Sequence, residues 1–167
     1  MRSPTLIGVG LLVIFIVMKL RSAMAFDRMD WHYGGDYPEN LSHENAGTHI
    51  GFYLAWLIQN GLVGEFHQEE SVDEIAAVCA RKMDGRTFLI SMCDEKFIDE
   101  DVNEEGLAFT EFYYQAEEGG YFDDYERILA KGLPTVYHVE NTWENYDKIA
   151  TVIAAAFNNW KDRQSSF

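Results

Sequence analysis

Side chains that could bind a metal ion gather near the N-terminal end of the main domain. Three of the five histidines, His32, His43 and His49, lie within about one loop and one helical turn, and Asp36 lies among them. Imidazole and carboxylate ligands together suit zinc, manganese or iron. We therefore interpret His32, Asp36, His43 and His49 as candidate metal ligands. Their spacing matches no established metal motif, and histidines that cap loop carbonyls would explain the same residues.

An acidic stretch further along the chain could bind a cation or a basic protein. Asp99, Asp101 and Asn103 alternate as in a calcium loop, but Glu104 stands where that loop needs glycine. A solvated helix start, where the helix dipole favours carboxylates, explains these residues more simply. The candidate interaction residues in this stretch are Asp99, Glu100, Asp101, Glu104 and Glu105.

The sequence carries no recognisable catalytic motif. The domain has no G-x-S-x-G, phosphate loop, dinucleotide fingerprint or cysteine nucleophile motif. Cys79 and Cys93 each fall at a helical core position, which predicts buried, unreactive thiols. We therefore predict no catalytic residue, no cofactor-binding residue and no cofactor, and the sequence favours a protein that is not an enzyme.

The net charge of the domain limits its partners. The chain has 28 acidic and 13 basic residues, and three of the basic ones (Arg2, Lys19 and Arg21) precede residue 26, so residues 26–167 carry 10 minus 28, or −18. Such a surface repels nucleic acid and anionic lipid, and it attracts basic proteins. The prediction is a basic protein partner and no nucleic acid. Solubility alone is the alternative explanation of this acidity.

An uninterrupted apolar run, from Leu6 to Met18, precedes the acidic domain. The run is shorter than the ~20 residues that a helix needs to span a bilayer core, although flanking Arg and Lys side chains can lengthen it. Lys19, Arg21 and Arg28 then favour an uncleaved anchor with the domain on the cytoplasmic side. The sequence thus predicts a single-pass membrane protein, with residues 4–20 in the membrane.

Two other interpretations of the leader remain open. Ala23-Met24-Ala25 offers a signal-peptidase site, so that the protein would be exported after cleavage at Ala25. Alternatively, translation starts at Met24 and the protein is cytoplasmic. The domain organisation is accordingly an apolar leader, residues 1–25, and an acidic helical domain, residues 26–167.

Helical periodicity and capping residues predict a mainly α fold. We expect one compact domain of five or six helices after an N-terminal apolar helix, with a loop over Phe26–Glu44 and one extended segment over Thr135–Glu140. The expected helices run from Asn45 or Thr48 to Ile58, Val72 to about Met83, Arg86 to Cys93, about Asn103 to before Gly119, Tyr121 to Lys131, and from Asn141 past Trp160.

Several segments resemble an uncharacterised family of small bacterial proteins. The resemblance rests on Trp31-His32-Tyr33-Gly34-Gly35-Asp36-Tyr37-Pro38, on Thr48-His49-Ile50-Gly51, and on shorter segments around Cys93, Asn103 and Tyr137–Tyr146. It covers about Met24 to Trp160 and implies a compact, largely helical fold. It implies no established activity, so no catalytic residue is carried over.

Two classes of function follow from these observations. The first is an acidic interaction protein, such as an immunity-type protein that binds a basic partner or toxin through its carboxylates. The second is a metal-dependent enzyme or small-ligand binding protein that uses the region of His32, Asp36, His43 and His49.

Overall fold

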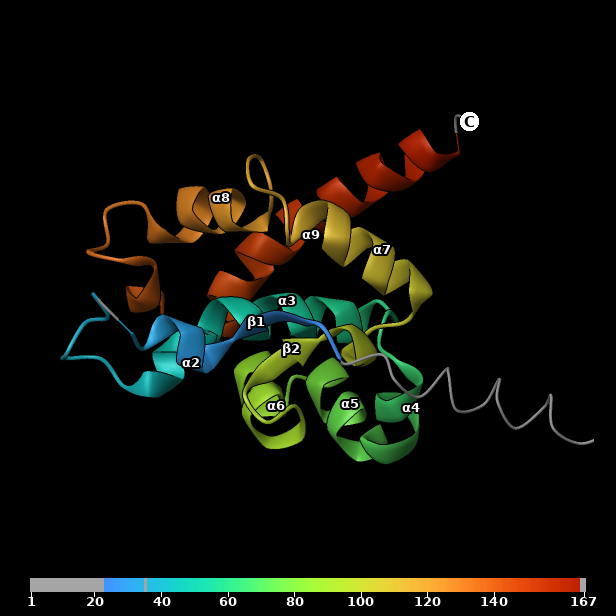
Figure 1. Ribbon diagram of the computed structural model, residues 1–167, viewed down its shortest axis with the longest axis horizontal. Helices are drawn as coiled ribbons and strands as arrows, with labels where there is room; N and C mark the ends of the chain where they lie inside the picture. The colour runs from blue at the N-terminus through green and yellow to red at the C-terminus, as the bar shows by residue number, and fades with distance from the viewer. Residues whose placement is uncertain (1–22, 35, 166–167) are drawn as a thin grey trace, which may run out of the picture.

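A buried helix, α3 (Thr48–Gln59), forms the centre of the fold (Figure 1). The structure is a computed structural model that describes residues 23–34 and 36–165. Every residue from Thr48 to Ile58 is buried, because apolar side chains occur on nearly all sides of this helix. The remaining elements pack around it, so the described residues form a single, mainly helical domain.

Two groups of helices cover opposite sides of α3 (Figure 1). The first group contains α5 and α6, both in contact with α3, and α4, which packs against α5. The second contains α9, which packs against α3, and α7 and α8, which pack against α9. The bounds are α4 (Glu65–Glu70), α5 (Val72–Cys79), α6 (Gly85–Met92), α7 (Glu104–Tyr113), α8 (Tyr121–Tyr125) and α9 (Trp143–Gln164).

A two-stranded antiparallel sheet lies beside α3. Its strands are β1 (Ala25–Arg28) and β2 (Lys96–Ile98), and the short helix α2 (Met29–His32) follows β1 directly. Short turns complete the chain: 3-10 turns η1 (His43–Gly47), η2 (Asp99–Asp101) and η4 (Val136–His138), and a π-helical turn, η3 (Glu126–Ala130).

The predicted mainly α, single-domain fold is confirmed, with differences in detail. The segment Phe26–Glu44, predicted as a loop, contains β1 and α2, and the segment predicted as extended, Thr135–Glu140, contains the turn η4. Helix α4 was not predicted. The expected helix at Val72–Met83 ends at Cys79, because Arg81 adopts a φ of 58° that no helix continues through.

The predicted apolar helix and its membrane span, residues 4–20, lie outside the described residues. Within 23–34 and 36–165, no helix is long and apolar enough to cross a membrane. This finding contradicts the prediction of a single-pass membrane protein.

Candidate functional site

A buried carboxylate, Asp27, forms the centre of the candidate site. The register of the sheet shifts between Ala25 and Asp27, and such a bulge turns consecutive side chains to the same side. Phe26 and Asp27 are therefore both buried, although neighbours in a regular strand alternate. A lone buried carboxylate is costly, so its environment must supply hydrogen-bond donors.

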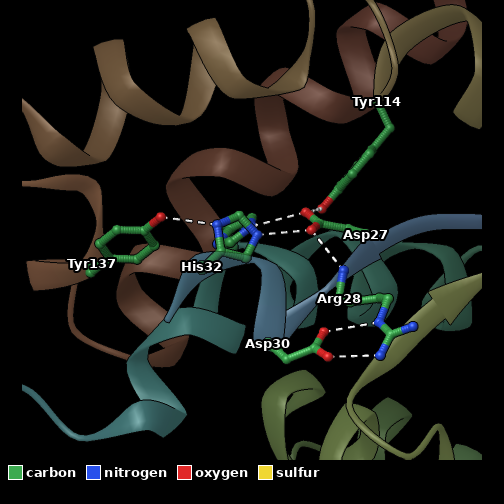
Figure 2. A network of polar contacts seen from close by, with 7 residues as sticks. Asp27, Arg28, Asp30, His32, Tyr114 and Tyr137 are labelled. Atoms are coloured by element: carbon green, nitrogen blue, oxygen red, sulfur yellow. Dashed lines mark hydrogen bonds and ion pairs between the residues drawn. The ribbon is translucent and has the colours of Figure 1, made fainter. Parts of the chain in front are cut away.

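Two histidines supply such donors from neighbouring helices (Figure 2). His32, the last residue of α2, places Nε2 2.8 Å from Asp27 Oδ1. His49, in the first turn of α3, places Nε2 3.1 Å from Asp27 Oδ2. The two imidazole rings meet edge to face, with centroids 4.7 Å apart. Both histidines therefore direct the same ring nitrogen at one carboxylate.

Further hydrogen bonds hold Asp27 and His32 in place (Figure 2). The Tyr114 hydroxyl donates to Asp27 Oδ2 at 2.7 Å, and the Arg28 backbone N–H donates to Oδ1 at 2.8 Å. The Tyr137 hydroxyl lies 2.9 Å from His32 Nδ1. The site thus joins β1, α2 and α3 to the end of α7 and to η4, which are distant in sequence.

The electrostatics of the cluster favour a charged Asp27 carboxylate and a neutral His49 imidazole. Burial opposes ionisation of Asp27, but the hydrogen bonds from His32 and His49 outweigh it and lower the pKa of the carboxyl well below its ordinary value. Burial lowers the pKa of His49, and Asp27 only partly offsets this. An ionised carboxylate accepts hydrogen bonds only, so both Nε2 atoms carry a proton.

This arrangement can bind a divalent cation. The ligand atoms of Asp27, His32 and His49 all lie within 4.8 Å of one another. Two imidazoles and a carboxylate form a ligand set that suits zinc or ferrous iron. A metal ion requires both Nε2 atoms to be unprotonated, and with its proton on Nδ1, His32 would donate to the Tyr137 hydroxyl. A hydroxyl serves in either role, so Tyr137 can orient His32 with or without a metal.

The structure unites two of the four sequence-predicted ligands. His32 and His49 belong to the cluster, whereas His43 is exposed and its ring stacks on Tyr33 at a centroid distance of 4.3 Å. Asp36 is exposed and is not one of the three clustered residues. Asp27, and not the predicted Asp36, supplies the carboxylate of the cluster.

The predicted interaction residues differ in their exposure. Glu100 and Glu104 are exposed, and Glu105 forms an ion pair with Lys161 at 2.8 Å. Asp101 is only 5% exposed, and its carboxylate accepts hydrogen bonds from His67 and from the Ile98 backbone. Asp101 is therefore not accessible to a partner. Asp99 is partly buried and bonds the Met24 backbone N–H at 2.9 Å.

The two cysteines also differ from their prediction. Both are free; Cys79 is exposed, because Val78 occupies the buried face of α5, and Cys93 is partly buried. Burial, followed by the charge of Asp101, raises the pKa of the Cys93 thiol well above its ordinary value. This pKa disfavours a nucleophilic role for Cys93.

Sequence reasoning missed Asp27, Tyr114 and Tyr137 as members of the site. A short strand with an irregular register gives no clear periodicity, so nothing marks Asp27 as buried. Tyr114 and Tyr137 lie 87 and 105 residues from their partners in the sequence. The only available signal was the presence of His32 five residues after Asp27.

Comparison with known proteins places the chain in a family without assigning an activity. No curated protein and no solved structure matches the chain. Residues 25–139 match a family described as "Domain of unknown function (DUF7832)", and Asp27, His32, His49, Tyr114 and Tyr137 all lie within the matched segment. The chain therefore belongs to this uncharacterised family.

Proposed function

We propose that the protein binds a divalent transition-metal ion through Asp27, His32 and His49. The observation that carries the proposal is the convergence of two imidazole Nε2 atoms on one buried carboxylate, at 2.8 and 3.1 Å. Three protein ligands leave a coordination position for water or a small ligand. His32, whose side chain is 17% exposed, gives that position a route to solvent.

The electrostatics around the cluster support a cation. Asp27 carries the negative charge, and the pKa of His49 is lowered, so its imidazole is neutral near pH 7 and does not repel a cation. Tyr114 and Tyr137 bond Asp27 and His32 from outside the ligand set, as outer partners commonly do at metal sites. The same bonds also satisfy the polar atoms of Asp27 and His32 in the metal-free protein, so a measurement of bound metal distinguishes the two states.

A comparison of His32→Asn with His43→Asn tests the proposal. His43 is a histidine of the same region that the structure leaves outside the cluster, which makes it the matched control. Isothermal titration of the untagged, chelator-treated protein with Zn²⁺ should show one equivalent fewer in His32→Asn than in wild type. His43→Asn should bind as wild type does. Equal binding by all three proteins would refute the site.

A second candidate function, binding of a basic partner, is supported by the surface of α4 and α5. A pocket of about 320 Å³ opens there, lined by apolar side chains that include Val63, Val72 and Ile75. Phe66 and Val72 are each 58% exposed. Residues 61–80 contain five acidic residues (Glu65, Glu69, Glu70, Asp73 and Glu74) and no Lys or Arg.

Apolar side chains among carboxylates fit a basic, amphipathic segment of a partner protein. The pocket would take an apolar side chain, and the carboxylates would pair with Lys or Arg around it. Helix α4 also packs against η2, so Glu100 extends the same acidic surface. Asp101 faces inward and contributes nothing to it.

A synthetic amphipathic peptide of Lys and Leu is a suitable probe of this surface. Glu69→Lys combined with Glu70→Lys should weaken binding in a fluorescence-anisotropy titration. The matched control reverses Glu117 and Glu118, two exposed carboxylates on the loop before α8, at the opposite side of the fold (Figure 1). Binding should also weaken with salt, because the Debye length falls from ~30 Å at 0.01 M to ~8 Å at 0.15 M. Equal effects of the two reversals would contradict a specific face.

A further inference from the structure

A second group of metal-ligand side chains lies between α4, the end of α6 and η2. His67 on α4 is fully buried, and its Nε2 lies 2.7 Å from Asp101 Oδ1. Cys93, just after α6, places Sγ 3.7 Å from the same Nε2. The three ligand atoms lie within 4.8 Å of one another, although His67 precedes Cys93 by 26 residues and Asp101 by 34.

The geometry of this cluster differs from that of a catalytic triad. In a nucleophile–histidine–acid triad, the nucleophile and the acid bond opposite nitrogens of the imidazole. Here Cys93 and Asp101 both approach Nε2, and the other nitrogen, Nδ1, lies 3.1 Å from the Ser71 hydroxyl. A metal ion requires ligand atoms that converge on one point, as Nε2 of His67, Sγ of Cys93 and Oδ1 of Asp101 do here.

The distances suit a tetrahedral ion after a small adjustment. With Zn–S of about 2.3 Å and Zn–N of about 2.0 Å, neighbouring S and N ligands of a tetrahedron lie about 3.5 Å apart. The observed separation of Sγ and Nε2 is 3.7 Å. His67 and Asp101 would have to move apart from their direct hydrogen bond.

The surroundings hold two of the ligands in place. Ser71, the residue before α5, makes no capping bond to its own helix, and its hydroxyl instead bonds His67 Nδ1. The Ile98 backbone N–H donates to Asp101 Oδ2 at 2.7 Å. After Cys93, Asp94 and Glu95 both have positive φ, 50° and 61°, which is costly for residues other than glycine. This turn leads the chain from α6 into β2 and fixes where Cys93 lies.

We propose that His67, Cys93 and Asp101 form a second metal site, specific for zinc or a similarly thiophilic ion. Only the thiolate is a metal ligand, so the Cys93 thiol would release its proton to solvent as the ion binds. A thiolate ligand excludes magnesium and calcium, and a thiolate with a carboxylate would be neutralised by a dication. Three protein ligands leave the fourth position to water or another small ligand. The site shares no residue with the site at Asp27, His32 and His49, so the two metal sites can be tested independently.

Cobalt substitution of the untagged full-length protein tests this site, because thiolate bound to Co²⁺ absorbs in the near ultraviolet. We expect this band in wild type, in His32→Asn and in Cys79→Ser, whose exposed cysteine is the matched control. We expect its loss in Cys93→Ser. No thiolate band with Co²⁺ in wild type, or a band that survives Cys93→Ser, would overturn the proposal.

A second measurement needs no variant and so does not depend on whether Cys93→Ser folds. In wild type, a thiol reagent should label Cys79 at the same rate with or without Zn²⁺, whereas Zn²⁺ should slow labelling of Cys93 by at least tenfold. Labelling of each cysteine is followed by peptide mass spectrometry. Equal labelling of Cys93 in the two conditions would contradict zinc ligation.

Discussion

The close contact between α3 and α6 makes Gly85 a sensitive position. A Cβ at Gly85 would lie 1.9 Å from the Gly51 carbonyl oxygen, whereas real Cβ contacts are essentially never shorter than 3.0 Å. The obstacle is backbone, which cannot rotate away as a flexible side chain can. Gly85→Ala must therefore separate the two helices and loosen the packing around the fully buried Phe88 and Leu89.

The expected cost of Gly85→Ala is about 3 kcal/mol, the upper end of overpacking penalties, because both helix backbones are involved. The better helix propensity of alanine offsets at most about 1 kcal/mol. A net loss of about 2 kcal/mol corresponds to a fall in melting temperature of about 4–8 °C for a domain of this size.

Urea unfolding followed by circular dichroism measures this loss. Gly34→Ala is the matched control, because a Cβ there meets nothing within 4 Å and the backbone is not left-handed. Gly34→Ala should unfold within about 0.5 kcal/mol of wild type, as surface substitutions usually do. A Gly85→Ala protein as stable as the control would refute the close packing of α3 on α6.

Two further predictions concern the partly buried Asp84 and the buried pair Tyr53 and Thr110. Burial opposes ionisation of Asp84, but hydrogen bonds from Asn141 and Thr87 outweigh it and lower the pKa of the carboxyl. The ionised carboxylate therefore stabilises the fold above its unfolded pKa of about 3.9, and this stabilisation is lost as pH falls through the folded pKa. Asp84→Asn should thus destabilise at pH 7 by about 1 kcal/mol, because a neutral amide accepts weaker hydrogen bonds than the ionised carboxylate. Urea unfolding at pH 3 should show a smaller difference; an equal difference at both pH values would contradict this. The Tyr53 hydroxyl lies 3.3 Å from Thr110 Oγ1 in the core. Thr110→Val should therefore lower the free energy of unfolding by about 1–3 kcal/mol, because the Tyr53 hydroxyl is left without a partner. Combining Thr110→Val with Tyr53→Phe should recover part of that loss, as measured by the same urea unfolding. A double variant that shows the full sum of both single losses would argue against the bond.

The sequence predicted best the elements whose periodicity is long and whose caps are explicit. Helix α9 begins at Trp143, close to the predicted start at Asn141, because Thr142 Oγ1 accepts from the Asn145 backbone N–H. Asn103 caps α7 in the same way, through Gly106 N. The strands could not be predicted, since β1 and β2 have four and three residues and give no clear alternation. Helix α5 begins at Val72 as predicted, although the side chain of Ser71 before it bonds His67 rather than the helix.

The candidate site could be predicted only in part. His32 and His49 were identifiable because they lie close together in the sequence. Asp27 was not, because its burial depends on a bulge paired with β2 about seventy residues away. His67, Cys93 and Asp101 carry no local pattern at all; His67 lies 34 residues from Asp101 in the sequence. Such sites are assembled by packing, and only the fold brings their ligands together.

The most direct test of the central claim is the number of Zn²⁺ ions bound by wild type, His32→Asn and His43→Asn, measured by equilibrium dialysis of untagged protein. Because His32 directs Nε2 into the cluster and His43 stacks on Tyr33 outside it, we expect His32→Asn to bind one ion fewer than wild type. We expect His43→Asn to bind as many ions as wild type. The same number of ions in wild type and His32→Asn would contradict a metal site at Asp27, His32 and His49.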